Sequence, residues 1–193
     1  MTTTAVKRLL VTATVSAATV MITMTGPGAH AVSLSSDLTC EGTEALSLSP
    51  GLTNIQRDTT ITGTALLNDC FSPASTDSDI VSGKATISAT GSNGCSQTGN
   101  ESGTVIFTWY SGPHQTGNEV GSTTVPYILS EHPDLTDNEI ANEQKGSATL
   151  ASTRLALDNM TGSFKLTGTA GGCTAIGINE LTADIGVDFA PVL

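Results

Sequence analysis

The feature that most constrains the fold of this chain is a succession of short runs rich in threonine, valine, isoleucine and alanine. Glycine, proline, asparagine, aspartate or serine ends nearly every run, which is typical of strands and turns. The runs predict strands at Glu44–Ser49, Thr59–Leu67, Ile80–Thr90, Gly103–Tyr110, Ser122–Leu129, Ser147–Leu157, Gly162–Thr169 and Ala175–Phe189.

No long helical pattern interrupts these runs. About eight or nine strands joined by short turns predict an all-β fold, and we expect an antiparallel β-sandwich of the Ig-like or a related Greek-key type. A closed barrel is the alternative. One segment, Thr136–Lys145, has the signals of a capping box and a helix end, although a solvated acidic loop explains it equally well.

The beginning of the chain has the parts of a secretory signal peptide. Lys7 and Arg8 precede an acid-free apolar stretch from Leu9 to about Met24, and a small-x-small ending follows at Ala29–Ala31. The apolar stretch is shorter than the ~20 residues of a membrane span. We therefore predict a signal peptide at residues 1–31, cleavage after Ala31, secretion without a membrane anchor, and a single β-sandwich domain at residues 32–193.

Acidic residues dominate the predicted mature domain. The signal holds two of the seven basic residues and none of the eighteen acidic ones, so five basic and eighteen acidic residues remain, a net charge of −13. Because nucleic acids and anionic membranes bind basic surfaces, we expect neither as a partner. The composition as a whole resembles that of small exported bacterial proteins.

Four cysteines lie in this domain, Cys40, Cys70, Cys95 and Cys173. An even number in an exported chain predicts disulfides, and no pair has the C-x-x-C spacing of a zinc or redox centre. Cys40 and Cys70 are placed symmetrically about a loop at Pro50–Asp58, so we predict that they face each other across neighbouring strands. The second predicted disulfide, Cys95–Cys173, then joins two glycine-rich turns.

The side-chain alternation complicates the first of these pairings. Leu46 and Leu48 share a face with Cys40, whereas Ala65 and Leu67 are out of phase with Cys70. Because side chains alternate with period two, an extra residue must enter the second strand. We therefore predict a bulge or a strand end at Asn68–Asp69.

Motifs of catalysis are missing from the sequence. It contains no nucleophile elbow, zinc-protease motif, Walker A loop or dinucleotide fingerprint. His114 and His132 stand in stretches typical of solvated loops. The acids at Asp77 and Asp79, and those between residues 131 and 143, are oxygen ligands of the kind that calcium prefers, but neither stretch matches the calcium-binding loop. We therefore predict no catalytic residue, no metal site and no cofactor.

The most informative stretch for binding is VIFTWYSGPHQTG, at Val105–Gly117. Trp109, the only tryptophan, shares a face with Val105 and Phe107, so we expect it in the core. Tyr110 points the other way. Since aromatic rings at strand ends pack well on sugars, Tyr110 and His114 are the candidate binding residues.

These observations predict a secreted, non-catalytic protein that is structural or binds an extracellular partner, a polysaccharide or a protein. A carrier or sequestering protein for a small apolar ligand is the alternative, and a secreted hydrolase using dispersed carboxylates is the third reading. A deep apolar cleft would favour the carrier. Two buried carboxyl groups in one groove would favour the hydrolase.

Overall fold

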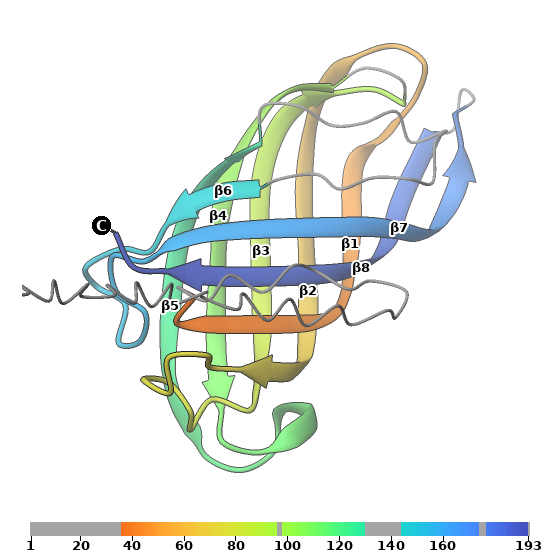
Figure 1. The fold of residues 1–193 in the computed structure, drawn as a ribbon. Coiled ribbons are helices and arrows are strands. Elements are labelled where there is room, and N and C mark those ends of the chain that lie inside the picture. Colours follow the sequence, from red (N-terminus) through yellow and green to blue (C-terminus); the bar gives the residue numbers. More distant parts are fainter. Residues whose placement is uncertain (1–35, 96–97, 130–143, 174–176, 193) are drawn as a thin grey trace, which may run out of the picture. The chain divides into compact units, whose positions relative to one another are not determined.

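The computed structural model describes residues 36–95, 98–129, 144–173 and 177–192, and these form eight antiparallel strands (Figure 1). A short 3-10 turn, η1 (Pro113–Gln115), follows the fourth strand. The strands are β1 (Leu38–Leu52), β2 (Arg57–Phe71), β3 (Ser82–Asn93), β4 (Thr98–Tyr110), β5 (Glu119–Leu129), β6 (Gln144–Ser147), β7 (Asn159–Gly172) and β8 (Gly177–Ala190). The predicted signal peptide lies outside the described residues, as does most of the segment with helical signals.

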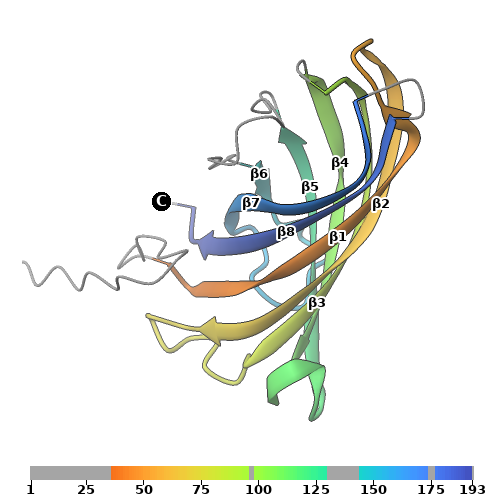
Figure 2. The same cartoon turned by 90° about the vertical axis from the view of Figure 1, so that its right-hand side faces the viewer.

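Each strand pairs with its neighbours in the sequence, and β8 pairs with β1, so that the sheet closes into a ring (Figures 1 and 2). The all-β, antiparallel prediction is confirmed. The Greek-key sandwich is not confirmed, because the strands follow one another round the ring in the order of the sequence, whereas in a Greek key the fourth strand returns to lie beside the first. Short turns, such as the one between β1 and β2, keep consecutive strands adjacent.

The ring has its shortest strand at β6. This strand pairs with β5 at two positions, Tyr127 opposite Gly146 and Ile128 opposite Lys145, and with β7 at four positions. The remainder of β5 is bounded on this side by the segment after β6, which contributes hydrogen bonds without joining the sheet.

The strand predicted at Ser147–Leu157 is wrong, because the chain leaves the sheet after Ser147. Leu155 and Leu157 have φ angles of 52° and 70°. Strands do not adopt this left-handed backbone. Within the same segment the Thr153 N–H donates to the carbonyl of Ser122 at 2.9 Å, which ties the loop to β5.

Both predicted disulfides are present in the structure. Cys40–Cys70 joins β1 to β2, with the two Cα atoms 4.1 Å apart, and Cys95–Cys173 joins the turn after β3 to the turn after β7. The first links neighbouring strands, and the second links two turns far apart in the sequence.

The predicted bulge is also confirmed. Glu41 lies opposite Asp69, but the next residue, Gly42, lies opposite Leu67. Asn68 is therefore the extra residue in β2. With this extra residue, Cys70 lies opposite Cys40 while Ala65 and Leu67 still face inward.

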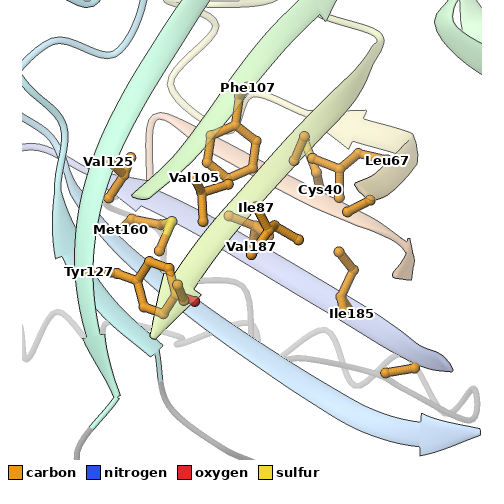
Figure 3. Packing of buried hydrophobic residues seen from close by; sticks show 14 of the residues in the cluster. Cys40, Leu67, Ile87, Val105, Phe107, Val125, Tyr127, Met160, Ile185 and Val187 are labelled. Carbon is orange, nitrogen blue, oxygen red and sulfur yellow. The ribbon is translucent and has the colours of Figure 1, made fainter. Parts of the chain in front are cut away.

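Buried aliphatic and aromatic side chains point inward from strands all around the ring and form its core (Figure 3). Trp109 is fully buried, as predicted. Its ring stacks on Phe107 with centroids 5.1 Å apart and meets Phe189 edge-on at 5.8 Å. Phe107, Trp109 and Phe189 thus form an aromatic cluster at the end of the ring where β4 and β8 finish.

Candidate functional site

The other end of the ring encloses a pocket. It lies where β1, β3 and β5 end and where β2, β4 and β8 begin, and it has an empty volume of about 660 Å³, its solvent-open mouth included. Its walls are mostly apolar, because inward-facing positions of the strands carry leucine, isoleucine and alanine here. The main contributors are Leu46, Leu48 and Leu52 of β1, Phe164 and Leu166 of β7, and Leu181 of β8.

Four polar residues stand among these apolar walls: Glu44, Asn93, Glu101 and Tyr127. Glu101 is buried, with 3 % of its surface exposed. The Tyr127 hydroxyl donates to Oε1 of Glu101 at 2.8 Å. Asn93 is equally buried, and its side-chain oxygen has no hydrogen-bond partner among the described residues.

Gly91 allows two of these polar side chains to approach each other. It lies opposite Glu101 in the register of β3 and β4. A Cβ atom at Gly91 would lie 3.1 Å from both Nδ2 of Asn93 and Cβ of Glu101. The two side chains therefore converge over a position that has no side chain of its own.

The carboxyl groups of the pocket affect each other's protonation. Burial raises the pKa of Glu44 to about 7, and the charge of Glu101 contributes in the same direction. Burial also raises the pKa of Tyr127, as do the charge of Glu101 and the hydrogen bond to it. Tyr127 therefore stays a neutral hydrogen-bond donor to Glu101, and Glu44 is poised between its two protonation states at neutral pH.

The two binding residues predicted from the sequence lie at the opposite end of the ring. Tyr110 is the half-buried last residue of β4, and His114 is exposed in η1. Nδ1 of His114 is 3.3 Å from Oδ1 of Asn68, the bulged residue. Their role in binding stays a prediction, and the structure does not bring them to the pocket.

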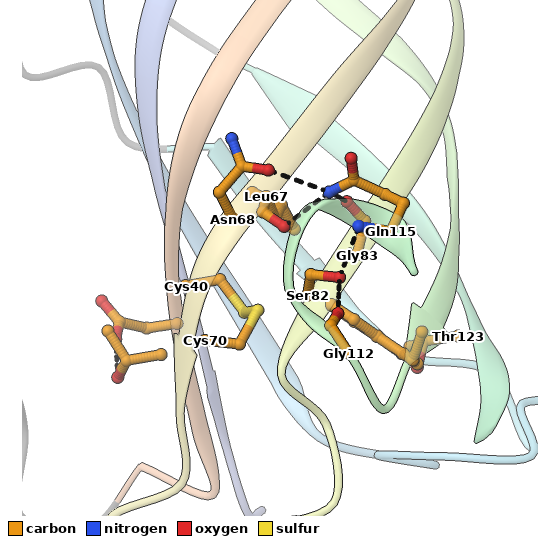
Figure 4. Close-up of a disulfide and its surroundings, with 12 residues drawn as sticks. Cys40, Leu67, Asn68, Cys70, Ser82, Gly83, Gly112, Gln115 and Thr123 are labelled. Carbon is orange, nitrogen blue, oxygen red and sulfur yellow. Dashed lines mark hydrogen bonds between the residues drawn. A yellow bond between two sulfur atoms is a disulfide. The ribbon is translucent and has the colours of Figure 1, made fainter. Parts of the chain in front are cut away.

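The turn that carries His114 is tied down by its neighbour Gln115 (Figure 4). The Gln115 amide donates to the carbonyls of Leu67 and Gly83 at 2.9 and 3.0 Å, and its backbone N–H donates to Oγ of Ser82 at 2.9 Å. Gln115 thus binds a carbonyl beside the bulge and the facing carbonyl on β3.

The acids considered as calcium ligands are engaged otherwise or lie outside the described residues. Asp77 and Asp79 both pair with Arg154, the first with an Nη1–Oδ1 distance of 3.3 Å. Among the described residues, no group of three or more histidine, cysteine, aspartate or glutamate side chains is arranged to hold a metal ion. His132 and the acids between residues 131 and 143 belong to the part of the chain that is not described.

Sequence reasoning missed Glu44, Asn93 and Glu101 as site residues. The signal was present in the alternation: Glu44 is in phase with Leu46 and Leu48, and Glu101 is in phase with Val105 and its inward-facing successors. Two carboxyl groups on inward faces of amphipathic strands indicate a polar site inside the fold.

Comparison with protein-family models, with curated proteins and with solved structures found no match. In the part of the chain that the structure describes, none of the helical segments has the length and apolar character needed to span a membrane.

Proposed function

We propose that the protein is a secreted, non-catalytic carrier that holds a small, largely apolar ligand inside the ring. The observation that supports this most directly is the pocket, whose lining is mostly leucine, isoleucine, phenylalanine and alanine with a few polar side chains among them, as in sites that bind small molecules. The interior of a closed sheet of about eight strands is either filled by side chains or holds one small ligand, so a ligand of this size is compatible with the ring. This was the alternative function in the sequence analysis.

The packing of the inward-facing side chains supports a carrier over a purely structural protein. The aromatic end of the ring is closed by Trp109, Phe107 and Phe189, which are nearly inaccessible. At the pocket end, by contrast, Leu46, Leu166 and Leu181 face inward and stay partly accessible. Apolar surface kept open within a fold is costly unless a ligand covers it. The two disulfides fit an exported protein, because such bonds persist in oxidising compartments.

Binding of a neutral fluorescent apolar probe, N-phenyl-1-naphthylamine, tests the proposal on protein secreted from the full chain. Ala183→Phe places a ring in the pocket and should weaken probe binding by about tenfold or more, because the added side chain occupies ligand space. Ala45→Phe is the matched control, since Ala45 is exposed on the outer face of β1. We expect the control to bind the probe as the wild type does.

Two results would contradict the carrier. Absence of probe binding by the wild type, or equal binding by Ala183→Phe and Ala45→Phe, would show that the pocket is not a ligand site. Retention on an insoluble polysaccharide that depends on Tyr110 and not on Ala183 would instead favour a surface-binding module. Hydrolysis of chromogenic glycosides by the wild type, lost in Glu44→Gln, would favour the hydrolase.

A further inference from the structure

We infer that the ligand carries a positively charged nitrogen, an amine or a guanidine, which binds among Glu44, Glu101 and Asn93 while the apolar remainder packs on the leucine walls. The inference rests on the proposed carrier function and names the chemical class of its ligand: an amphiphilic organic cation.

The hydrogen-bonding groups of the pocket favour a ligand that donates. The hydroxyl hydrogen of Tyr127 is already committed to Glu101, at 2.8 Å. The atom of Asn93 that has no partner among the described residues is its oxygen, an acceptor. Leaving a buried acceptor unpaired is costly, so a ligand that supplies N–H donors gains the difference. An ammonium or guanidinium group supplies several such donors.

The charges of the pocket favour a positively charged ligand. Glu44 comes from β1 and Glu101 from β4, three strands further round the ring. Among the described residues, no lysine, arginine or histidine lines the pocket. An anionic ligand would add negative charge to a poorly solvated acidic site, whereas a cation would offset the repulsion that opposes the ionisation of Glu44 beside Glu101.

The placement of the leucines explains why the cation must be part of an apolar molecule. Glu44, Leu46 and Leu48 alternate along one inward face of β1, and all three line the pocket. A molecule that contacts the carboxyl group therefore also contacts the leucines. Small hydrated cations would leave this apolar wall uncovered.

Binding of such a cation should be linked to the ionisation of Glu44. The ionisable groups that act on Glu44 are Glu101 of β4, whose charge opposes its ionisation, and Tyr127 of β5, which stays neutral. The lining residues from β2, β3, β7 and β8 carry no charge. Because the ammonium group prefers ionised Glu44, its affinity should rise with pH up to about 7, where Glu44 titrates.

The test compares octylammonium, octanol and octanoate, which share one apolar chain and differ in charge, by displacement of N-phenyl-1-naphthylamine. We expect octylammonium to bind about tenfold tighter than octanol at pH 7.5, the smallest gain typical of a hydrogen bond to a charged group. Octanoate should bind weakest. Between about pH 5 and pH 7 the affinity for octylammonium should rise and that for octanoate should fall, while the affinity for octanol should not change.

Three variants test which residues cause the preference for octylammonium over octanol. Glu44→Gln and Glu101→Gln should each reduce the advantage of octylammonium over octanol by about tenfold, while the unchanged affinity for octanol shows that the pocket has formed. Glu41→Gln removes the same charge from an exposed position on β1 and should leave the preference intact. This control separates the pocket from the general attraction of an acidic protein for cations.

The outcomes distinguish this inference from the proposed function. If neither N-phenyl-1-naphthylamine nor octanol binds, the carrier function itself fails. If octanol binds and octylammonium binds no tighter, or if Glu41→Gln lowers the preference as much as Glu44→Gln does, the carrier stands and the cationic ligand is excluded.

Discussion

Trp109 is accommodated inside the ring because Gly83 lies opposite it on β3. A Cβ atom at Gly83 would lie 2.6 Å from the indole ring, closer than any real contact. The indole N–H donates to Oγ1 of Thr123 at 2.8 Å, and that hydroxyl donates in turn to the carbonyl of Arg154 at 2.8 Å. The residue is therefore buried with its polar atom satisfied.

Gly83→Ala should lower the free energy of unfolding by about 1–3 kcal/mol, because the added methyl group overpacks the tryptophan site. Gly172→Ala is the control, since a Cβ atom there meets nothing within 4 Å. Urea denaturation followed by tryptophan fluorescence measures both. Equal stability of the two variants would contradict the packing described for Trp109.

Alternation predicted the burial of Trp109 correctly. The same rule also predicts that Glu101 faces inward, because it has the same parity as Trp109 on β4. Solvated loops are the default prediction for the acids at Asp77 and Asp79 and for those between residues 131 and 143, whereas Glu101 is a buried carboxyl group, which is costly without a partner. What offsets that cost lies on other strands: the Tyr127 hydroxyl comes from β5. The sequence around Glu101 does not contain this partner, so the site could not be predicted from one strand at a time.

Among the strands and turns, prediction succeeded where alternation was long and failed at Ser147–Leu157. Threonine favours strands by propensity, but in this segment the threonine and serine side chains serve as hydrogen-bonding groups for β5. Oγ1 of Thr153 accepts from the N–H of Ser122 at 2.8 Å, and Oγ of Ser152 accepts from the N–H of Thr124 at 3.0 Å. The segment thus supplies β5 with hydrogen-bond partners although it is not itself a strand.

The β4–β5 turn offers a test of how a loop stabilises a bulge. Gln115→Ala removes the donors to the carbonyls of Leu67 and Gly83, and we expect a loss of about 1–3 kcal/mol because partly buried carbonyls are left unpaired. His114→Ala is the matched control, because His114 is exposed. Chemical denaturation of both variants decides the matter. A larger loss from His114→Ala would mean that the histidine, and not the glutamine, holds the turn.

The closure of the sheet could not be read from the sequence. A strand has one buried and one exposed face both in a sandwich and in a closed ring, so alternation does not distinguish the two. The deciding contact is the pairing of β1 with β8, which brings Leu38 opposite Phe189 across nearly the whole domain. The predicted disulfides gave no information on the pairing of β1 with β8, since neither of them joins these two strands.

The closed ring encloses carboxyl groups, and the stability of the molecule should therefore rise as the pH falls from about 7 to about 5. Burial, and then the charge of Glu101, raises the pKa of Glu44 from 4.5 to about 7. Burial, followed by the charges of Asp37 and Asp77, raises the pKa of Asp158 from 3.8 to about 6. Between these limits the folded protein holds protons that the unfolded chain has lost, so the free energy of unfolding falls as the pH rises.

Thermal unfolding followed by circular dichroism from about pH 4.5 to pH 8 measures this dependence. For Glu44 the effect is on the order of 3 kcal/mol, so Glu44→Gln should remove most of the slope between about pH 5 and pH 7. Asp158→Asn should remove the part of the pH dependence of the melting temperature that lies below about pH 6. Glu41→Gln, exposed on the same strand as Glu44, should keep the wild-type profile. A wild-type melting temperature that rises toward neutral pH would mean that these carboxyl groups are stabilised in their ionised form, which is incompatible with burial beside another negative charge.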